Sequence, residues 1–308
     1  MSRTSALDAA GIDDPQLRAS YALCRSLHAE HGKTYYLATL LLPPAKRAYV
    51  HALYGFARYA DEIVDDLAST LSAEEKAQQL VSWGERVLAD LEDGRSDDPV
   101  GRALVHTART WDIPVEHFTA FLASMRMDLT ITGYPTYADL SSYMHGSAAV
   151  IGLQMVPILE PQDDRAYAHA ADLGVAFQLS NFIRDVGEDL RRGRVYLPQQ
   201  DLDRFGVTRD DLARGTTTAP VRELLRFEVE RTRDLYARAR PGIDLLHPSS
   251  RECIRTAFEL YGGILDEVDR ADYDVLRRRV RVPVRRRLQV ALPAYARARR
   301  TWRAVPHG

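Results

Sequence analysis

The sequence predicts an all-α protein, and three observations carry this prediction. Helix start signals recur along the 308 residues, apolar side chains repeat at helical spacing, and no segment shows convincing strand alternation. A chain of this length could form two average domains, but neither a low-complexity linker nor an internal repeat divides it. We therefore expect one helical domain over residues 1–308, with about 1–14 and about 300–308 poorly ordered.

The individual helices are predicted from their N-terminal signals. Asp14 before Pro15 can cap and open a helix that runs to about residue 31, and Pro43-Pro44 opens the next helix to about residue 67. The later signals, in order, are a capping box at 72–75, starts at 98–99 and 113–114, a helix after Thr136, a long helix over about 163–190, a loop over 191–201, and helices over about 219–239 and 249–271.

Composition excludes several classes of protein. The chain is 45% hydrophobic and 27% charged with a net charge of -2, so no overall charge attracts nucleic acid and we expect no nucleic-acid partner. Cys24 and Cys253 form no metal-binding or disulfide pattern, which fits a reduced cytoplasm. No secretory signal is visible, and His145, Gln154 and Pro157 interrupt the most apolar stretch, so we expect a cytoplasmic protein without a membrane span.

The C-terminal segment departs from this charge balance. After Asp274 the chain has eleven arginines and no acid, with valines and leucines between them. One interpretation is a solvated terminal helix face. The other is contact with anionic lipid headgroups, giving a membrane-peripheral protein, or with an anionic substrate at the near end of the segment.

Acidic residues on an otherwise apolar helix give the first indication of function. Asp61 and Asp65 are four residues apart, so their carboxylates lie on one helix face, where like charges cost about 0.2–0.5 kcal/mol. A solvated acidic helix end would explain this pair if it stood alone.

A second set of oxygen ligands makes a metal site the better hypothesis. Asn181, Asp185 and either Glu188 or Asp189 share one helix face in "QLSNFIRDVGED". Two facing acidic walls would repel each other unless a divalent cation lay between them, and oxygen-only ligands favour Mg²⁺. Because Mg²⁺ usually binds substrate phosphates as well as carboxylates, the acids predict a phosphorylated substrate.

Longer motifs around these acids resemble the head-to-head prenyl synthases, the phytoene/squalene synthase family. "DEIVD" (61–65) matches the first aspartate-rich motif and "NFIRDVGED" (181–189) the second, followed by "GRVYLP" (193–198) at the family's spacing. "HGKTYYLATLLLP" (31–43) and "YGGILDEVDRADYDVLRRRV" (261–280) resemble the N-terminal substrate segment and the C-terminal helix. "HALYGFARYADEIVDD" and "YMHGSAAVIGLQMVPIL" are most similar to bacterial phytoene synthases. Two departures are Glu62, where many relatives have Asp, and the sequence after Tyr143, where many have Cys.

The resemblance implies an isoprenoid-synthase helical bundle with both motifs facing across a deep cavity. Asp61 and Asp65 would hold Mg²⁺ on one diphosphate, and Asn181, Asp185 and Asp189 would do so on the other. The cations expected to assist are Arg58, Arg184 and Arg278, with Lys33 and His31 behind them. The other expected substrate contacts are Gln178 and the tyrosines Tyr35, Tyr54, Tyr143 and Tyr261.

The implied reaction condenses two geranylgeranyl diphosphates to phytoene through prephytoene diphosphate. It would need about two or three Mg²⁺ ions, or Mn²⁺ in their place, and would not need NADPH. Alternatives are a relative that uses farnesyl diphosphate to make squalene, dehydrosqualene or presqualene diphosphate, a non-catalytic assembly factor, and a lipid-surface binding module. The sequence does not indicate chain length or oligomeric state.

Overall fold

Helices form all the regular secondary structure in residues 5–65 and 71–304, which a computed structural model describes. Side chains at 64, 65, 73, 303 and 304 lie outside this description. Two isolated bridges, Gly133 with Val195 and Pro161 with Leu246, are the only β-type pairings in that part of the chain. The all-α prediction is confirmed.

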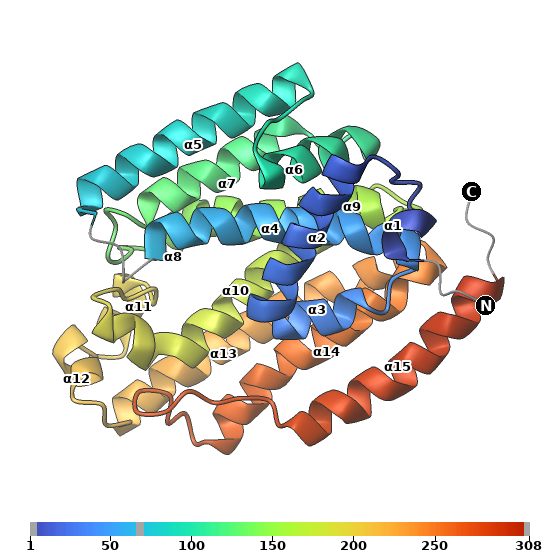
Figure 1. Cartoon of the computed structure of the whole chain (residues 1–308). Helices are drawn as coiled ribbons and strands as arrows, with labels where there is room; N and C mark the ends of the chain where they lie inside the picture. Colours follow the sequence, from blue (N-terminus) through green and yellow to red (C-terminus); the bar gives the residue numbers. More distant parts are fainter. Residues whose placement is uncertain (1–4, 66–70, 305–308) are drawn as a thin grey trace.

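The helices follow one another with short connections (Figure 1). In order they are α1 (Ala6–Ala9), α2 (Pro15–His31), α3 (Lys33–Thr39), α4 (Pro44–Asp65), α5 (Ala73–Asp93), α6 (Pro99–Thr110), α7 (Val115–Met127), α8 (Tyr137–Met144), the π-helix η1 (His145–Ala149), α9 (Val150–Leu159), α10 (Arg165–Arg191), α11 (Gln199–Arg204), α12 (Arg209–Ala213), α13 (Ala219–Ala239), the 3₁₀ helix η2 (Arg240–Leu245), α14 (Pro248–Arg270) and α15 (Val284–Ala304).

Local capping explains where most of these helices begin. Asp14 accepts a hydrogen bond from the backbone N–H of Leu17 at 2.7 Å, and Ser72 and Glu75 cap each other's backbone as predicted. Two segments differ from expectation. A helix forms at Ala6–Ala9, where poor order was expected, and the loop expected over 191–201 ends early because α11 starts at Gln199.

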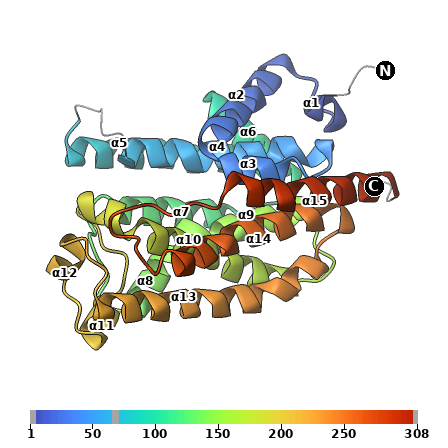
Figure 2. The same ribbon diagram turned by 90° about the horizontal axis from the view of Figure 1, so that it is seen from below.

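Two clusters of buried side chains hold the bundle together. The first lies mainly among α2, α4, α5, α6 and α7 and includes Phe56, which stacks on Trp83 of α5 and meets Phe118 edge to face. The second lies among α8, α10, α13 and α14. Figure 1 places α5 outermost on one side and α15 on the other, and Figure 2 shows α15 running beside α14. The long helix α10 packs against α9, α13 and α14 and so supports both clusters.

Small residues let helices approach closely around η1 and α9. A Cβ added at Gly146 would lie 2.2 Å from the carbonyl oxygen of Ala120, and one at Gly152 would lie 2.3 Å from that of Ala170. Other small side chains of this segment, Ser147 and Ala148, instead border the cavity described below. The small residues therefore serve both close packing and open space.

An ion pair between a buried lysine and a partly exposed glutamate joins three helices near the start of α4. The Lys46 side chain is 5% exposed, its ammonium forms an ion pair with Glu160, and its Nζ donates to Ser250 Oγ at 3.0 Å. Glu160 follows the last residue of α9 with a left-handed φ of 54°. This cluster of Lys46, Glu160 and Ser250, here called the clasp, connects α4, α9 and α14.

Candidate active site

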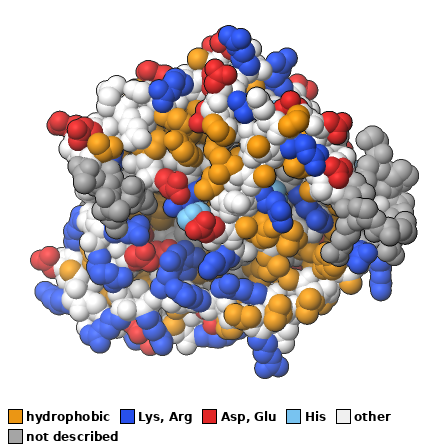
Figure 3. All heavy atoms as spheres, in the orientation of Figure 1, with side chains coloured by type: hydrophobic (Ala, Val, Ile, Leu, Met, Phe, Trp, Pro, Cys, Tyr) orange, Lys and Arg blue, Asp and Glu red, His pale blue; other side chains and the backbone are white. Residues whose placement is uncertain are grey.

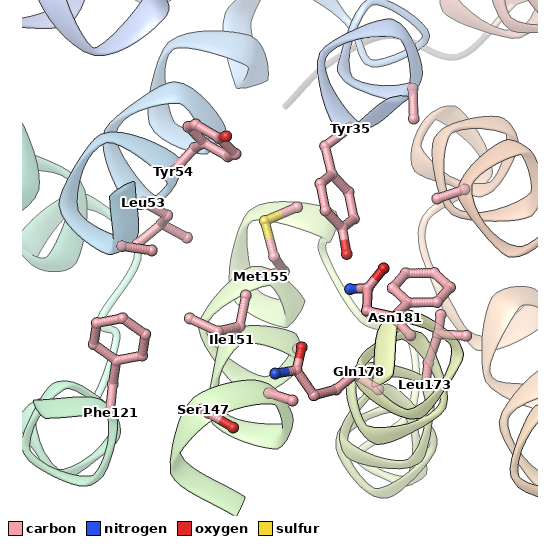
Figure 4. A pocket seen from close by; sticks show the side chains of 18 of the residues that line it. Tyr35, Leu53, Tyr54, Phe121, Ser147, Ile151, Met155, Leu173, Gln178 and Asn181 are labelled. Carbon is pink, nitrogen blue, oxygen red and sulfur yellow. The ribbon is translucent and has the colours of Figure 1, made fainter. Parts of the chain in front are cut away.

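A cavity of about 530 Å³ lies between the helices that carry the two acidic motifs. Its walls come mainly from α3, α4, α7, η1, α9, α10 and α14. Most of the lining is apolar, and Figure 4 shows Leu53, Phe121, Ile151 and Met155 on one side of the space, with Gln178 and Asn181 on the other. The cavity can therefore hold a hydrocarbon chain and exclude water from most of its length.

Charged side chains line the cavity where α4 and α10 end, a region here called the polar end. They comprise four acids and four arginines: Asp61, Asp128, Asp185, Asp189, Arg58, Arg184, Arg192 and Arg194. The acids could bind metal cations and the arginines could bind anionic groups, so this region suits a ligand that combines the two.

Asp185 is the centre of the charge network in the second motif. Arg184 donates to both carboxylate oxygens, at 2.8 and 2.5 Å, and the exposed Arg279 reaches the same two oxygens at 2.7 and 2.9 Å. Arginine forks of this kind also fit phosphate oxygens bidentately. Asp185 thus holds two guanidinium groups beside the cavity.

Asp189, one helical turn further, is the cavity-lining acid of the two alternatives. Burial and then the negative charge of Asp185 raise its pKa to about 7. Glu188 does not line the cavity and pairs instead with Arg192 at 3.1 Å and with Arg279 at 3.5 Å. A cation bound nearby would stabilise the ionised form of this carboxyl group and so lower its pKa.

The donor set of the polar end fits Mg²⁺. Asp61, Asn181, Asp185 and Asp189 all line the cavity and offer oxygen ligands, without histidine or thiolate among them. Among the described side chains, however, no three acidic, histidine or cysteine groups converge as a ready-made metal cluster. Asp61 pairs with Arg58 at 3.6 Å, and two arginines cover Asp185. Asp65 is the last residue of α4, and its side chain lies outside the described set.

Tyr54 borders the cavity one turn before Arg58. Its ring stacks on His28 at 4.1 Å with an angle of 6°, and His28 Nδ1 hydrogen-bonds His51 Nδ1 at 2.9 Å. Burial and then the neighbouring His51 lower the pKa of His28 to about 3, while burial raises the pKa of Tyr54 to about 12. Both rings are therefore uncharged near neutral pH.

Tyr35 and Tyr261 form one aromatic layer, but only Tyr35 lines the cavity. Their rings stack at 4.7 Å, and Tyr261 also packs on Phe177 at 4.5 Å. Figure 4 shows the Tyr35 hydroxyl pointing toward Asn181. Tyr261 therefore supports two cavity-lining rings from behind.

Tyr143 reaches the polar end through Asp128. Its hydroxyl donates to Asp128 Oδ2 at 2.9 Å, and that of Tyr196 donates to Oδ1 at 3.3 Å. Arg194 donates to the Asp128 carbonyl at 2.7 Å. These bonds attach the loop after α10 to the end of α7, and burial followed by the Asp128 charge raises the pKa of Tyr143.

The sequence matches the family description "Squalene/phytoene synthase" over residues 28–286. The chain belongs to the squalene/phytoene synthase family. It is 38% identical to a phytoene synthase of Arthrospira platensis over 294 residues, covering 91% of this chain and 94% of that protein. It is 37% identical to a 15-cis-phytoene synthase of Synechocystis, covering 91% of this chain and 85% of that protein.

Solved structures of the squalene/phytoene synthase fold superpose well on the chain. A dehydrosqualene synthase in complex with a ligand matches with a TM-score of 0.83 at 26% identity, covering 92% of this chain and 98% of that one. The squalene synthase HpnC of Alicyclobacillus acidocaldarius matches with a TM-score of 0.78 at 28% identity, covering 86% and 98%. The predicted family and fold are confirmed.

Three cations expected at this family site are not among the residues that line the cavity. Arg278 points to Asp274, with which it pairs at 3.5 Å, and its neighbour Arg279 takes the place at Asp185. His31 lies 3.9 Å from Glu62, and Lys33 is exposed at the start of α3. The other predicted residues with described side chains line the cavity, except Tyr261.

Several synthase residues were missed from the sequence. Arg194 lies within the quoted "GRVYLP" motif and Arg192 directly precedes it. Their position just after the second acidic motif could have indicated them. No such indication exists for Asp128 or His28. Asp128 is an isolated acid at the end of α7 and His28 belongs to no motif within α2, so only the tertiary structure relates them to the cavity.

Proposed function

We propose that this protein condenses two geranylgeranyl diphosphates head to head into prephytoene diphosphate and converts that intermediate to phytoene. The observation that carries the proposal is one long apolar cavity whose polar end combines both aspartate-rich motifs with arginines. One proton leaves as the cyclopropane ring closes and another as the final cation collapses. Two diphosphates are released, and no reductant is required.

The polar end would bind the two diphosphates. Asp61 and Asp65 are proposed to hold Mg²⁺ on one side, and Asn181, Asp185 and Asp189 on the other. Bound Mg²⁺ would neutralise charge that develops on a departing diphosphate. Arg58, Arg184 and Arg279 would move from their carboxylate partners to phosphate oxygens, which match their geometry equally well.

The apolar part would protect the carbocations. Water would quench an allylic cation, and the aliphatic and aromatic lining leaves little room for it. Neutral rings such as Tyr54 and Tyr35 present electron-rich faces to cationic carbon. Because His28 stays uncharged, it adds no positive charge to this wall.

Cavity length and sequence similarity favour the longer substrate. Lining residues on α10 run from Ala166 to Asp189, about 35 Å of helix. The phytoene synthases at 36–38% identity are more similar to this chain than the dehydrosqualene and squalene synthases of known structure, at 26 and 28%. Farnesyl diphosphate is the alternative substrate.

Product analysis tests the proposal. Purified protein with Mg²⁺ is incubated with geranylgeranyl diphosphate or farnesyl diphosphate, each with and without NADPH, and the hydrocarbons are identified by mass spectrometry. We expect phytoene from the first substrate, independent of NADPH. Turnover of farnesyl diphosphate alone would reject the phytoene assignment.

Charge removal at the polar end tests the metal-assisted step. Asp61→Asn and Asp185→Asn should each lower kcat by at least about 100-fold, because transition-state charge stabilisation of this kind contributes several kcal/mol. Activity that survives both substitutions would show that diphosphate departure does not depend on these carboxylates.

A further inference from the structure

The outer face of α15 carries large apolar side chains that the protein does not cover. Val284, Leu288, Leu292 and Tyr295 follow one another at helical spacing and are 67, 49, 65 and 39% exposed. We call these four residues the apolar stripe. The described part of the chain has six exposed large hydrophobic side chains, and four of them belong to this stripe. Their concentration on one helix indicates a binding surface.

The inner face of α15 is held in place by other residues. Ala291, Ala294 and Ala298 are buried against the bundle. Arg286 pairs with Asp266 at 2.6 Å, and Arg297 pairs with Glu252 at 2.9 Å, so both ends of the helix are fixed to α14. The inward face thus consists of these alanines with the partly buried Val290 and Trp302, and the apolar stripe lies on the opposite, exposed side.

Arginines flank the apolar stripe. Arg281, Arg285 and Arg300 are exposed, and no ion pair is found for them within the described residues. No acid follows Asp274, whereas the whole chain has a net charge of -2. Figure 3 shows hydrophobic side chains beside Lys and Arg over the region of α15, at the lower right. The positive charge is therefore local to this face.

We propose that α15 docks the protein on an anionic lipid surface, with the apolar stripe inserted at the headgroup boundary and the flanking arginines on lipid phosphates. Exposed apolar residues bordered by arginines have the chemistry of an interfacial helix. A second copy of the chain fits less well, because a symmetric pairing would place this arginine-rich face against itself. No described helix is long and apolar enough to cross a membrane.

The position of α15 connects this surface to the polar end. Arg279, which holds Asp185, lies in the segment between α14 and α15, five residues before Val284. A docked α15 would place the polar end near the headgroups, where prenyl diphosphates partition. This consequence for substrate supply rests on the proposed function, whereas docking itself does not.

Vesicle sedimentation tests the docking surface without any substrate. The full-length protein is mixed with vesicles of phosphatidylcholine alone or with about one third phosphatidylglycerol, at low and high salt. We expect binding to the anionic vesicles that weakens with salt. Leu288→Ser with Leu292→Ser should lower the partition coefficient at least about tenfold. Arg285→Gln with Arg300→Gln should lower it about 25-fold, from about fivefold per arginine.

Leu23→Ser is the matched control, since Leu23 is 41% exposed on α2, away from the stripe. It should bind vesicles within about twofold of wild type, and all variants should keep the wild-type melting temperature. Absence of wild-type binding to anionic vesicles, or undiminished binding of the stripe variant, would overturn the proposal. The proposal would also be overturned if light scattering showed that the wild-type protein is a dimer, that the stripe variant is a monomer, and that neither binds vesicles. Phytoene synthesis in detergent is measured separately, so failure of one proposal leaves the other standing.

Discussion

Arg278 and Arg279 are sequence neighbours in different environments, which makes them a matched pair for testing the site. Arg279 forks onto both oxygens of Asp185, whereas Arg278 pairs with Asp274 away from the cavity. Arg279→Lys should raise KM or lower kcat/KM about tenfold, because lysine cannot form the bidentate contact. Arg278→Lys should change neither by more than about twofold. Equal effects in steady-state kinetics would argue against a role for Arg279 in diphosphate binding.

Glu228 gives a prediction about pH and stability. The side chain is 1% exposed, and although Arg231 donates to it at 2.9 Å, Asp201 competes for the same guanidinium at 2.8 Å. Burial, partly offset by Arg231, raises the pKa of Glu228 from 4.5 to about 8. Folding therefore favours the protonated form. Its stabilising contribution is complete below about pH 4.5 and is lost as pH rises through about 8.

The variant Glu228→Gln removes this titration and keeps the shape. Between about pH 5 and 8 the melting temperature of wild type should fall more steeply than that of the variant, by a difference on the order of 1 kcal/mol per pH unit in the free energy of unfolding, and above about pH 8 the two curves should run parallel. Circular dichroism melts at a series of pH values provide the measurement. Parallel curves for the two proteins would show that Glu228 is ionised throughout.

Single residues were the least predictable level from sequence, and backbone geometry explains why. Arg278 was expected at the site because residues 261–280 resemble the family's C-terminal helix, but α14 ends at Arg270, close to the predicted end at about residue 271. Asp272 and Tyr273 then adopt left-handed φ values of 49° and 61°. Helical periodicity does not apply beyond such a break, so the sequence could not decide which of two adjacent arginines faces Asp185. Within α10, where the helix continues, the ligand face from Asn181 to Asp189 does line one cavity.

At the scale of elements, two helical glycines provide a contrast. Gly146 in η1 leaves no space for a Cβ, which would lie 2.2 Å from the Ala120 carbonyl, whereas a Cβ at Gly262 in α14 would lie 3.8 Å from Tyr236. Gly146→Ala should destabilise the protein by about 1–3 kcal/mol through overpacking. Gly262→Ala should be neutral or stabilise it by up to about 1 kcal/mol. Denaturant unfolding measures both, and a neutral Gly146→Ala would mean that α7 and η1 separate easily.

Helix boundaries were predictable where a side chain caps the backbone. Asp14, Ser72, Asp98 and Thr136 all accept the expected N-terminal hydrogen bond. The π-helix at His145–Ala149 was not predicted, because its wider turn arises from packing against α7 and α10 and has no capping signal. The four-residue helix α1 was not predicted either, although Ser5 and Asp8 form a capping box at its start.

At the scale of the whole molecule, the two motifs belong to α4 and α10, on opposite walls of the cavity. A ligand that joins these walls should stabilise the entire fold. Mg²⁺ and pyrophosphate together should raise the melting temperature by several degrees, since about 100-fold saturation contributes about 2.7 kcal/mol.

Each component alone should have a smaller effect, because the carboxylates and arginines of the polar end already neutralise one another. Differential scanning fluorimetry with EDTA, Mg²⁺, pyrophosphate and both together measures this, with Asp61→Asn as the variant expected to lose the combined shift. A full shift from pyrophosphate in EDTA would indicate binding without a cation.

The overall architecture was predictable because its causes are repetitive. Apolar spacing, caps and two acidic faces each occur over many residues and point to the same helical bundle. The depth of the cavity was not predictable, because it depends on which lining residues of separate helices meet at its two ends.

The clasp lies just beyond the lining residues Leu159, Leu246 and Cys253. A wall of leucines could yield to a longer chain by changing rotamers. Here, elongation would have to separate the buried Lys46 ammonium group from Glu160, which costs about 1–3 kcal/mol because the Glu160 side chain is 43% exposed. We therefore expect this ion pair to limit the length of the prenyl chain that the cavity accepts. A prenyl diphosphate one isoprene unit longer than geranylgeranyl diphosphate should bind poorly unless Lys46 is replaced by methionine.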